Sequence, residues 1–345
     1  MIHWVPKKNI NTEKVNLLLE HSIQSNHFTN NGPNVKLLEQ KVREILKIDD
    51  DKSIICVSNG TVALWAVIAS FEMHLEKDLQ FATQSFTFPA SAQGYLQNVT
   101  IIDIDNEGGI DLLLINPEEC DGIIVTNVFG NLVDIKKYED WCSKYNKLLV
   151  FDNAATSYSM YNGKNSCNYG NATTISFHHT KPLGFGEGGC IIIDSKYEKT
   201  LRQIINFGID NLAISPKWHR KGSNYKMSDI QAVYISQYLD NFNKIVYHTK
   251  DLYSYFITQS KVLDITLFPN KSDDIPLVSC ICIFSKKSNE IIKLLLEHNI
   301  YSRKYYYPLI DTPVATEFFN NIVCIPCMVD MNKGDIDNII NIINI

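Results

Sequence analysis

The hydrophobic pattern of the first 240 residues alternates between short apolar runs and amphipathic segments. Apolar runs typical of buried strands cover residues 53–57, 99–104, 122–128, 147–151, 172–177 and 190–193. Between them, residues 61–73 and 134–145 have the apolar spacing of helices. Strands that are apolar throughout, rather than at every second position, indicate a sheet covered on both faces. The pattern therefore predicts an α/β fold.

The pattern changes after about residue 240. Residues 228–261 predict one long helix or two joined helices. The apolar side of this region is formed by Ile230, Val233, Tyr234, Tyr238 and Phe242. A strand over 278–284, a helix over 290–298, another strand and a terminal helix follow. We therefore expect a large domain over residues 1–240 and a smaller α+β domain over residues 241–345.

The composition is that of a globular protein, with 45% hydrophobic and 20% charged residues in a chain of 345. The 32 basic and 38 acidic residues give a net charge of −6 without any block of like charges, so we expect no nucleic-acid or anionic-lipid partner. No apolar run approaches the ~18 residues that a membrane span needs. The N-terminus lacks the apolar stretch of a secretory signal. These features predict a cytoplasmic protein without a membrane segment.

The nine cysteines are spread through apolar segments, as expected for reduced thiols rather than for a disulfide framework. One pair has the spacing Cys324-Ile-Pro-Cys327, but it lies inside an apolar run and no second pair accompanies it. We interpret this pair as part of a buried strand, with a redox or metal site as the alternative. No metal ion is expected.

Candidate chemistry gathers where the apolar strands end, which is the edge at which α/β sheets bind ligands. The first candidate is the turn Ser58-Asn59-Gly60-Thr61, between a strand and the start of a helix. Such a turn exposes backbone N–H groups that can bind an anion, and phosphate is the expected guest. The same residues also fit an ordinary turn with a threonine cap.

Two ionisable residues also follow buried strands. Asp152 comes directly after an apolar run, where a carboxylate needs a cation or hydrogen-bond donors; it is either a turn residue or the partner of a protonated heterocyclic nitrogen. Lys181 lies beyond the next run, ahead of a glycine-rich loop, and desolvation there would lower its pKa and free its amine as a nucleophile. An anion-binding turn, a buried aspartate and a nucleophilic lysine together match what pyridoxal phosphate requires.

Three more side chains accompany this set. Phe88 lies at the start of a predicted helix, where an aromatic ring can stack on a cofactor or simply belong to the core. His178 and His179 precede Lys181, but neighbours on a strand face opposite ways and no third metal ligand lies near them in the sequence.

These stretches resemble the DegT/StrS family of sugar aminotransferases, which have the aspartate-aminotransferase fold. The most specific match is Ser176-Phe177-His178-His179-Thr180-Lys181 together with Gly186-Glu187-Gly188-Gly189. Further matches keep the family's order over nearly the whole chain, at residues 31–33, 38–39, 60–64, 87–88, 130–131, 134, 152–155, 222–229, 303–309 and 325–326.

The resemblance implies a large pyridoxal-phosphate domain with a mixed, mostly parallel sheet, and it assigns roles to individual residues. Lys181 would form the internal aldimine and move protons, Asp152 would keep the pyridine nitrogen protonated, and Phe88 would stack on the ring. The cofactor-binding residues it implies are Gly60, Thr61, Phe88, Asp152, Ala155, Ser176, Lys181 and Asn224. Of these, Gly60, Thr61 and Ser176 would bind the phosphate. Asn224 would reach the cofactor of the neighbouring subunit, which implies a homodimer with shared active sites.

Substrate contacts are implied for His179, Glu187, Arg303 and Tyr305. Three positions depart from the usual family pattern: Asn59 stands where serine is usual, Asn127 where histidine is common, and Ala155 where histidine or glutamine often lies. These departures affect one phosphate contact and the substrate contacts, and they leave the cofactor assignment intact.

The implied reaction moves an amino group from L-glutamate to a nucleotide-linked keto-deoxysugar. Residues 303–308 look most like those of enzymes that aminate C4 of dTDP-4-keto-6-deoxyglucose; amination at C3 and a GDP- or UDP-linked sugar are the alternatives. A sugar dehydratase of the same fold is a further alternative, but such relatives have histidine in place of Lys181. A binding protein on this scaffold would be expected to lack Lys181 or Asp152. By analogy, the product is expected to enter a bacterial surface polysaccharide or lipopolysaccharide O-antigen.

Overall fold

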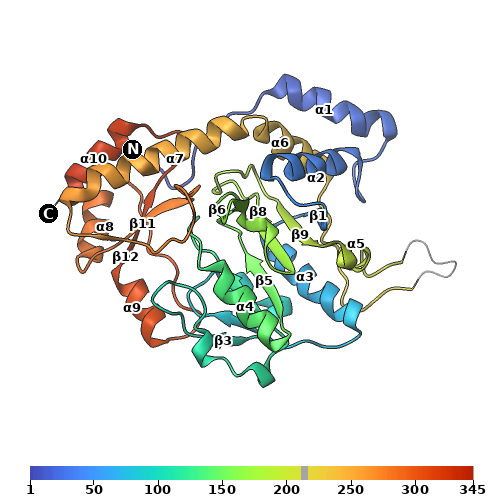
Figure 1. The fold of residues 1–345 in the computed structure, drawn as a ribbon. Helices are drawn as coiled ribbons and strands as arrows, with labels where there is room; N and C mark the ends of the chain where they lie inside the picture. Colours follow the sequence, from blue (N-terminus) through green and yellow to red (C-terminus); the bar gives the residue numbers. More distant parts are fainter. Residues whose placement is uncertain (211–216, 345) are drawn as a thin grey trace.

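A seven-stranded sheet forms the centre of the computed structural model, which describes residues 1–210 and 217–344 (Figure 1). Its strands, in spatial order, are β1 (Lys52–Val57), β9 (Gly189–Asp194), β8 (Ala172–Ser176), β5 (Leu148–Asp152), β4 (Gly122–Thr126), β2 (Phe81–Gln84) and β3 (Thr100–Ile102). Only β9 runs antiparallel to its neighbours, so the sheet is mixed and mostly parallel. The predicted α/β fold is confirmed.

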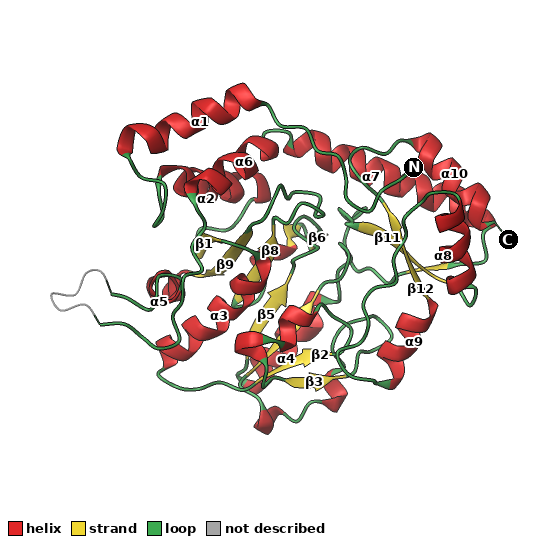
Figure 2. Ribbon diagram, turned by 180° about the vertical axis from the view of Figure 1, so that it is seen from behind, coloured by secondary structure: helices red, strands yellow, loops and turns green. Residues whose placement is uncertain are grey.

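Helices cover both faces of this sheet (Figure 2). On one face, α3 (Gly60–Leu75) and α5 (Glu198–Ile204) enclose a core that includes Ile55, Val150 and Ile191. The other face is covered by α2 (Pro33–Leu46), α6 (Asp229–Leu239) and α4 (Ile135–Tyr145). Helix α1 (Thr12–Ser25) lies outside α2 and α6. Coverage on both sides explains why the central strands are apolar throughout.

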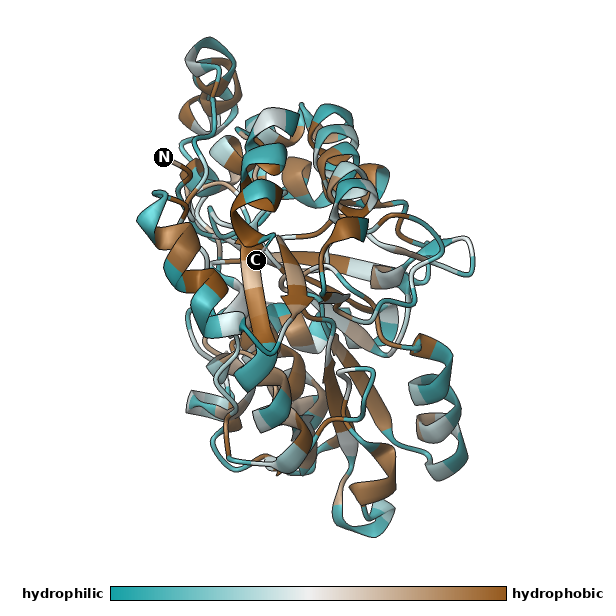
Figure 3. Ribbon diagram, turned by 90° about the vertical axis from the view of Figure 1, so that its left-hand side faces the viewer, coloured by the Kyte–Doolittle hydropathy of each residue, from teal (hydrophilic) through white to brown (hydrophobic). Residues whose placement is uncertain are grey.

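The C-terminal part has its own three-stranded antiparallel sheet of β10 (Thr266–Leu267), β11 (Cys280–Phe284) and β12 (Ile322–Pro326). One core joins this sheet to α7 (Phe242–Gln259), α8 (Ser288–Glu297) and α10 (Lys333–Ile343). Helix α9 (Pro313–Asn321) packs on the opposite side, against aromatic residues of the large sheet's loops. In Figure 3 the strands are hydrophobic and the outward faces of the helices are largely hydrophilic.

The start of the chain lies against this C-terminal part (Figure 1). Ile2 forms a bridge with Ile300, and Trp4 packs against the same region. The division into domains at residues 240 and 241 stays a prediction; α6 ends at Leu239 and α7 begins at Phe242. Among the described helices, none has the length and apolar character that a membrane crossing requires.

Two details differ from the sequence-based expectations. The segment after Phe88 forms two short 3-10 helices, Pro89–Ala92 and Gly94–Leu96, rather than an α-helix, because the chain turns at Gly94 with a φ of +55°. The apolar side predicted for residues 228–261 is also only partly buried. Ile230 and Tyr234 are 51% and 36% exposed, since the buried side of α6 runs through Val233 and Tyr238.

Candidate active site

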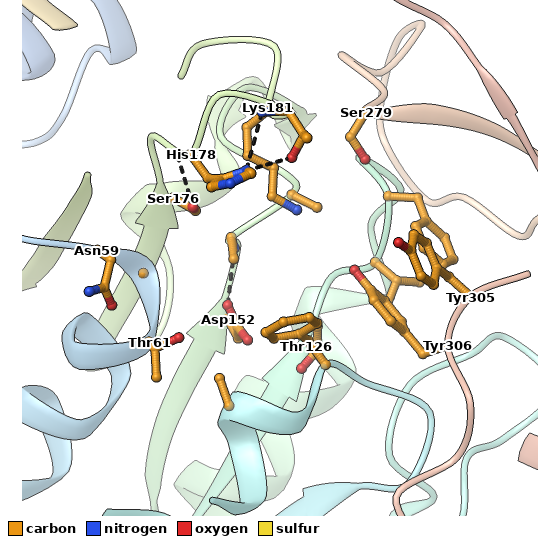
Figure 4. A pocket seen from close by; sticks show the side chains of 18 of the residues that line it. Asn59, Thr61, Thr126, Asp152, Ser176, His178, Lys181, Ser279, Tyr305 and Tyr306 are labelled. Atoms are coloured by element: carbon orange, nitrogen blue, oxygen red, sulfur yellow. Dashed lines mark hydrogen bonds between the residues drawn. The ribbon is translucent and has the colours of Figure 1, made fainter. Parts of the chain in front are cut away.

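A cavity of about 750 Å³ opens at the carboxyl ends of β4, β5 and β8 and extends to the C-terminal part (Figure 4). The strand register creates this convergence, because Asp152 at the end of β5 lies opposite Thr126 of β4 and Thr174 of β8. On the other side, Gly189 lies between Val57 of β1 and Ser176 of β8. The residues at and after these strand ends therefore lie together around the cavity.

The start of α3 provides an anion-binding surface on one wall of the cavity. Asn59 caps the helix by accepting a hydrogen bond from the Val62 N–H at 3.0 Å. This leaves the N–H groups of Gly60 and Thr61, which have no acceptor within the helix, beside the cavity. Ser176 closes the same corner, where a Cβ on Gly60 would lie 3.0 Å from the serine Cβ. Backbone donors, a positive helix end and two hydroxyl groups suit a phosphate.

Asp152 lies at the floor of the cavity and is 5% exposed. Its Oδ1 accepts hydrogen bonds from the Ala154 N–H at 3.0 Å and the Thr174 hydroxyl at 3.4 Å. Burial raises the pKa of this carboxyl group, and the Ala154 hydrogen bond opposes that shift. Within the part of the chain that the structure describes, it forms no ion pair, so a protonated nitrogen in the cavity would supply the missing partner.

Lys181 faces the cavity from the turn after β8. Burial lowers the pKa of its ammonium group, with opposing contributions from Cys280 and Asp152. A lowered pKa leaves more of the amine neutral near pH 7, as a nucleophile for an aldehyde requires. Lys181 and Asp152 thus meet across one cavity from separate strands.

Aromatic rings form the opposite wall. Phe88, which is 53% exposed, lies edge-to-face with Tyr306 at 6.1 Å between ring centroids. Tyr306 in turn stacks on Phe129 at 5.0 Å and lies next to Tyr305. A planar ring bound between Asp152 and this wall would be enclosed by apolar surface.

Most of the residues singled out from the sequence line the cavity, namely Gly60, Thr61, Phe88, Asp152, Ala155, Ser176, Lys181, Glu187 and Tyr305. Three lie elsewhere. The Nε2 atom of His179 is 3.2 Å from the Pro6 carbonyl, Arg303 lies over the Trp4 ring at 5.8 Å, and Asn224 bridges Asn206. Asn59 lines the cavity, but its side chain is used to cap α3.

Further residues line the wall to which the sequence assigned no cofactor or substrate contact: Trp4, Trp65, Thr126, His178, Ser279, Cys280, Tyr306 and Met328. Thr126 carries the same signal as Asp152, because it stands at the end of an apolar strand. His178 alternates with His179 and points its Nε2 toward Glu187 at 3.6 Å. The remaining members come mostly from the C-terminal part, and no local pattern marks them.

The cysteine pair Cys324 and Cys327 is buried, as expected for a strand residue and its neighbour after β12. The structure groups Cys324 with two other thiols instead. The Sγ atom of Cys282 is 3.5 Å from that of Cys280 and 3.7 Å from that of Cys324. The Cys-x-x-Cys spacing therefore does not define a ligand pair, since its two thiols belong to different surroundings.

The cavity fits pyridoxal phosphate on three independent grounds. The N-terminus of α3 suits the phosphate. Asp152 has hydrogen-bond donors but no ion-pair partner among the described residues, and a protonated pyridine nitrogen would be such a partner. Lys181 offers an amine to the aldehyde. The fold and the site define a pyridoxal-phosphate-dependent aminotransferase. The chain matches the DegT/DnrJ/EryC1/StrS aminotransferase family over residues 9–344 and belongs to it.

Two relatives with named activities span most of the chain, and a third covers less than two thirds of it. The dTDP-4-amino-4,6-dideoxy-D-glucose transaminase of Shigella dysenteriae is 27% identical, covering 94% of this chain and 93% of its own. The GDP-perosamine synthase of Vibrio cholerae is 24% identical, covering 86% and 83%. The UDP-2-acetamido-2-deoxy-3-oxo-D-glucuronate aminotransferase of Pseudomonas aeruginosa is 28% identical over 62% of this chain and 60% of its own.

Solved structures share the fold. The Helicobacter pylori aminotransferase PseC, involved in the biosynthesis of pseudoaminic acid, superposes with a TM-score of 0.84 at 20% identity, covering 99% of this chain and 98% of its own. DesI, solved with its TDP-sugar product, has a TM-score of 0.84 at 17% identity, covering 98% of this chain and 90% of its own. At these identities the likeness establishes the architecture, and the aspartate-aminotransferase-like fold is confirmed.

Proposed function

We propose that this protein transfers the amino group of L-glutamate to a nucleotide-linked keto-deoxysugar. The observation that carries the proposal is the single cavity in which the α3 N-terminus, Asp152 and Lys181 meet. When bound there, pyridoxal phosphate supplies an electron sink and carries the amino group between the two substrates. Relatives named for dTDP-, GDP- and UDP-linked amino sugars support a nucleotide-linked acceptor.

Each of the cavity residues named above has a separate role in this proposal. Gly60, Thr61 and Ser176 hold the phosphate, and the buried Asp152 carboxylate keeps the pyridine nitrogen protonated. Phe88, on the cavity wall, would stack on the ring. The Nζ of Lys181 accepts a proton from the Cα of glutamate and later donates a proton to the sugar carbon that gains nitrogen. Burial lowers the pKa of Lys181, which increases the share of neutral amine that can act as this base.

We propose C4 of dTDP-4-keto-6-deoxyglucose as the position aminated. Two of the relatives, from Shigella dysenteriae and Escherichia coli, are dTDP-4-amino-4,6-dideoxy-D-glucose transaminases at 27% and 25% identity. The cavity of about 750 Å³ also has polar groups on its wall, from Glu187, His178 and Tyr305. Amination at C3 and a GDP- or UDP-linked sugar are the competing assignments.

We also propose that the active unit is a homodimer, in which Asn224 serves the neighbouring subunit's cofactor. Two observations support this. Asn224 does not line the cavity of its own chain. Large apolar side chains are exposed on α6 and in the nearby segment before it, with Ile230 at 51%, Phe207 at 49% and Trp218 at 77%. Contiguous exposed apolar surface marks protein partners, and these side chains would contribute to such a surface.

The cofactor assignment is tested by the visible absorption spectrum of the protein with added pyridoxal phosphate. We expect a yellow lysine-bound band in the parent, bleached by L-glutamate, and no such band in Lys181→Ala. Lys36→Ala is the matched control, because Lys36 is an exposed lysine on α2. A parent that forms no band at saturating cofactor would overturn the assignment.

The acceptor is tested with a panel of nucleotide-linked 3-keto and 4-keto sugars and ¹⁵N-labelled glutamate. Mass spectrometry of the product should show one labelled nitrogen on the sugar. Labelling of a 3-keto sugar alone would overturn the C4 assignment. A deoxygenated product without nitrogen would identify the dehydratase alternative.

A further inference from the structure

Lys8, near the start of the chain, contacts the backbone of the turn that carries Lys181. Its Nζ donates one hydrogen bond to the Lys181 carbonyl at 2.6 Å and a second to the Gly184 carbonyl at 2.5 Å. The two acceptors are the first and last residues of the turn 181–184, which the Gly184 N–H closes by donating to the Lys181 carbonyl at 3.0 Å. One ammonium group thus spans both ends of the turn.

Helix α6 holds the same turn from a second direction. The Tyr238 hydroxyl donates to the Pro182 carbonyl at 3.2 Å, and the Lys8 Nζ lies 4.7 Å from the centre of the Tyr238 ring. Gly184 has no room for a side chain, since a Cβ there would lie 2.1 Å from the His178 carbonyl oxygen. Three carbonyls of a four-residue turn therefore accept hydrogen bonds from side chains outside it.

Lys8 is partly removed from water. Its burial lowers its pKa to about 7, and Asp330 opposes that shift. His179 lies beside the turn, and its pKa is lowered by burial and, to a lesser extent, by the charge of Lys8. In a partly buried site, hydrogen bonds between an amine and carbonyl oxygens meet less competition from water than at the surface. Loss of Lys8 would remove the side-chain donor shared by the Lys181 and Gly184 carbonyls and leave the turn with its backbone hydrogen bond alone at that point.

We propose that Lys8 is a positioning residue, which fixes the turn 181–184 so that the Lys181 side chain points into the cavity. The inference rests on the function proposed for Lys181. The side chain of Lys181 begins at the residue whose carbonyl Lys8 holds, so a shift of this backbone moves the reacting amine. Misplacement of a reacting group by about 1 Å can slow a reaction about 10²-fold, so a smaller shift is expected to slow it about tenfold.

The test compares the parent with Lys8→Met, Lys8→Arg and Tyr238→Phe, using the full-length protein. Lys7→Met is the matched control, because Lys7 is the exposed neighbour of Lys8. Two quantities are measured: the dissociation constant of pyridoxal phosphate from its visible band, and the rate at which saturating L-glutamate bleaches that band at saturating cofactor. Thermal unfolding of each variant is followed alongside.

We expect Lys8→Met to slow bleaching about tenfold or more, Lys7→Met to stay within about twofold of the parent, and Lys8→Arg to recover part of the rate. A Lys8→Met protein that folds and matches the parent in both quantities would overturn the inference. So would a folded Lys8→Arg that is as slow as Lys8→Met, because the effect would then lie in packing rather than in donated hydrogen bonds.

If Lys8→Met does not fold, Tyr238→Phe provides the test instead, because it removes the hydroxyl that donates to the Pro182 carbonyl of the same turn. A bleaching rate about threefold or more below the parent supports the inference, and a smaller change overturns it. The proposed function fails separately: a parent without the visible band contradicts the assignment of Lys181, whereas a banded parent with unaffected variants contradicts only the role of Lys8.

Discussion

Asp229 is a buried carboxylate whose replacement should measurably destabilise the protein. It is 0% exposed and lies at the first residue of α6. Its Oδ2 accepts from the Ser22 hydroxyl at 2.7 Å and from the Asn34 N–H at 2.9 Å, while Oδ1 accepts from the Val35 N–H at 2.9 Å. One side chain therefore joins α1, the N-terminus of α2 and α6.

Asp229→Asn keeps the shape of the side chain but removes its charge and replaces one acceptor by an amide donor. One acceptor position becomes an NH₂ group facing a buried N–H, and an unsatisfied buried group costs about 1–3 kcal/mol. The remaining hydrogen bonds lose the strength that a charged acceptor gives them, and the α2 N-terminus loses a negative charge worth about 0.3–1 kcal/mol. Together these effects predict a fall of about 1–4 kcal/mol in the free energy of unfolding.

Urea denaturation followed by circular dichroism measures this loss, and Asp273→Asn provides a matched control. Asp273 also accepts hydrogen bonds from two successive backbone N–H groups, those of Asn162 at 3.0 Å and Gly163 at 2.7 Å, but it is exposed. Its replacement should cost about 0.5 kcal/mol or less. If the unfolding midpoint of Asp229→Asn falls no further than that of Asp273→Asn, the reasoning from burial is wrong.

Three further predictions concern the active site. Asp152→Asn should still bind pyridoxal phosphate but react with L-glutamate about 10²-fold or more slowly in stopped-flow absorbance, because a neutral amide cannot hold the ring nitrogen protonated; an unchanged rate would contradict its role. Gly189→Ala should weaken cofactor binding about tenfold in equilibrium dialysis, since its Cβ would lie 2.4 Å from the Asn59 carbonyl and displace the phosphate turn; parent-like affinity would refute this. Because burial lowers the pKa of Lys181, the rate of aldehyde binding by the apoprotein should rise with pH and level off below the ordinary lysine pKa of 10.5; a midpoint at 10.5 would argue against a buried amine.

The central strands were predictable because burial on both faces leaves an unbroken apolar run. Helix α6 shows the limit of this reasoning. The spacing of Ile230, Tyr234 and Tyr238 correctly indicates a helix, but it cannot tell which residues face the core of the same chain. Tyr238 is 4% exposed, whereas Ile230 is 51% exposed. The spacing of apolar residues shows that a helix has an apolar side. It does not show which other part of the protein covers that side, because this depends on tertiary packing.

The same distinction holds within the site. Asp152 and Lys181 could be singled out because each follows a buried strand, so their neighbours in the sequence indicate their place at the sheet edge. Cys280 and Tyr306 reach the cavity only through the packing of the C-terminal part against the large sheet. Lys8 lies in a polar segment with the composition of a surface loop, and its burial follows from contacts with residues more than 170 positions away.

The strand order also has a consequence for how the chain is made. Strand β1 has one neighbour in the sheet, β9, which follows it by about 130 residues. At a synthesis rate of roughly 5–20 residues per second, β1 would wait roughly 7–26 s on the ribosome for that neighbour. Gly189, the first residue of β9, packs against the Asn59–Gly60 turn, so the corner that receives phosphate is incomplete until then. A nascent chain would therefore acquire its cofactor only after most of the large sheet has been synthesised.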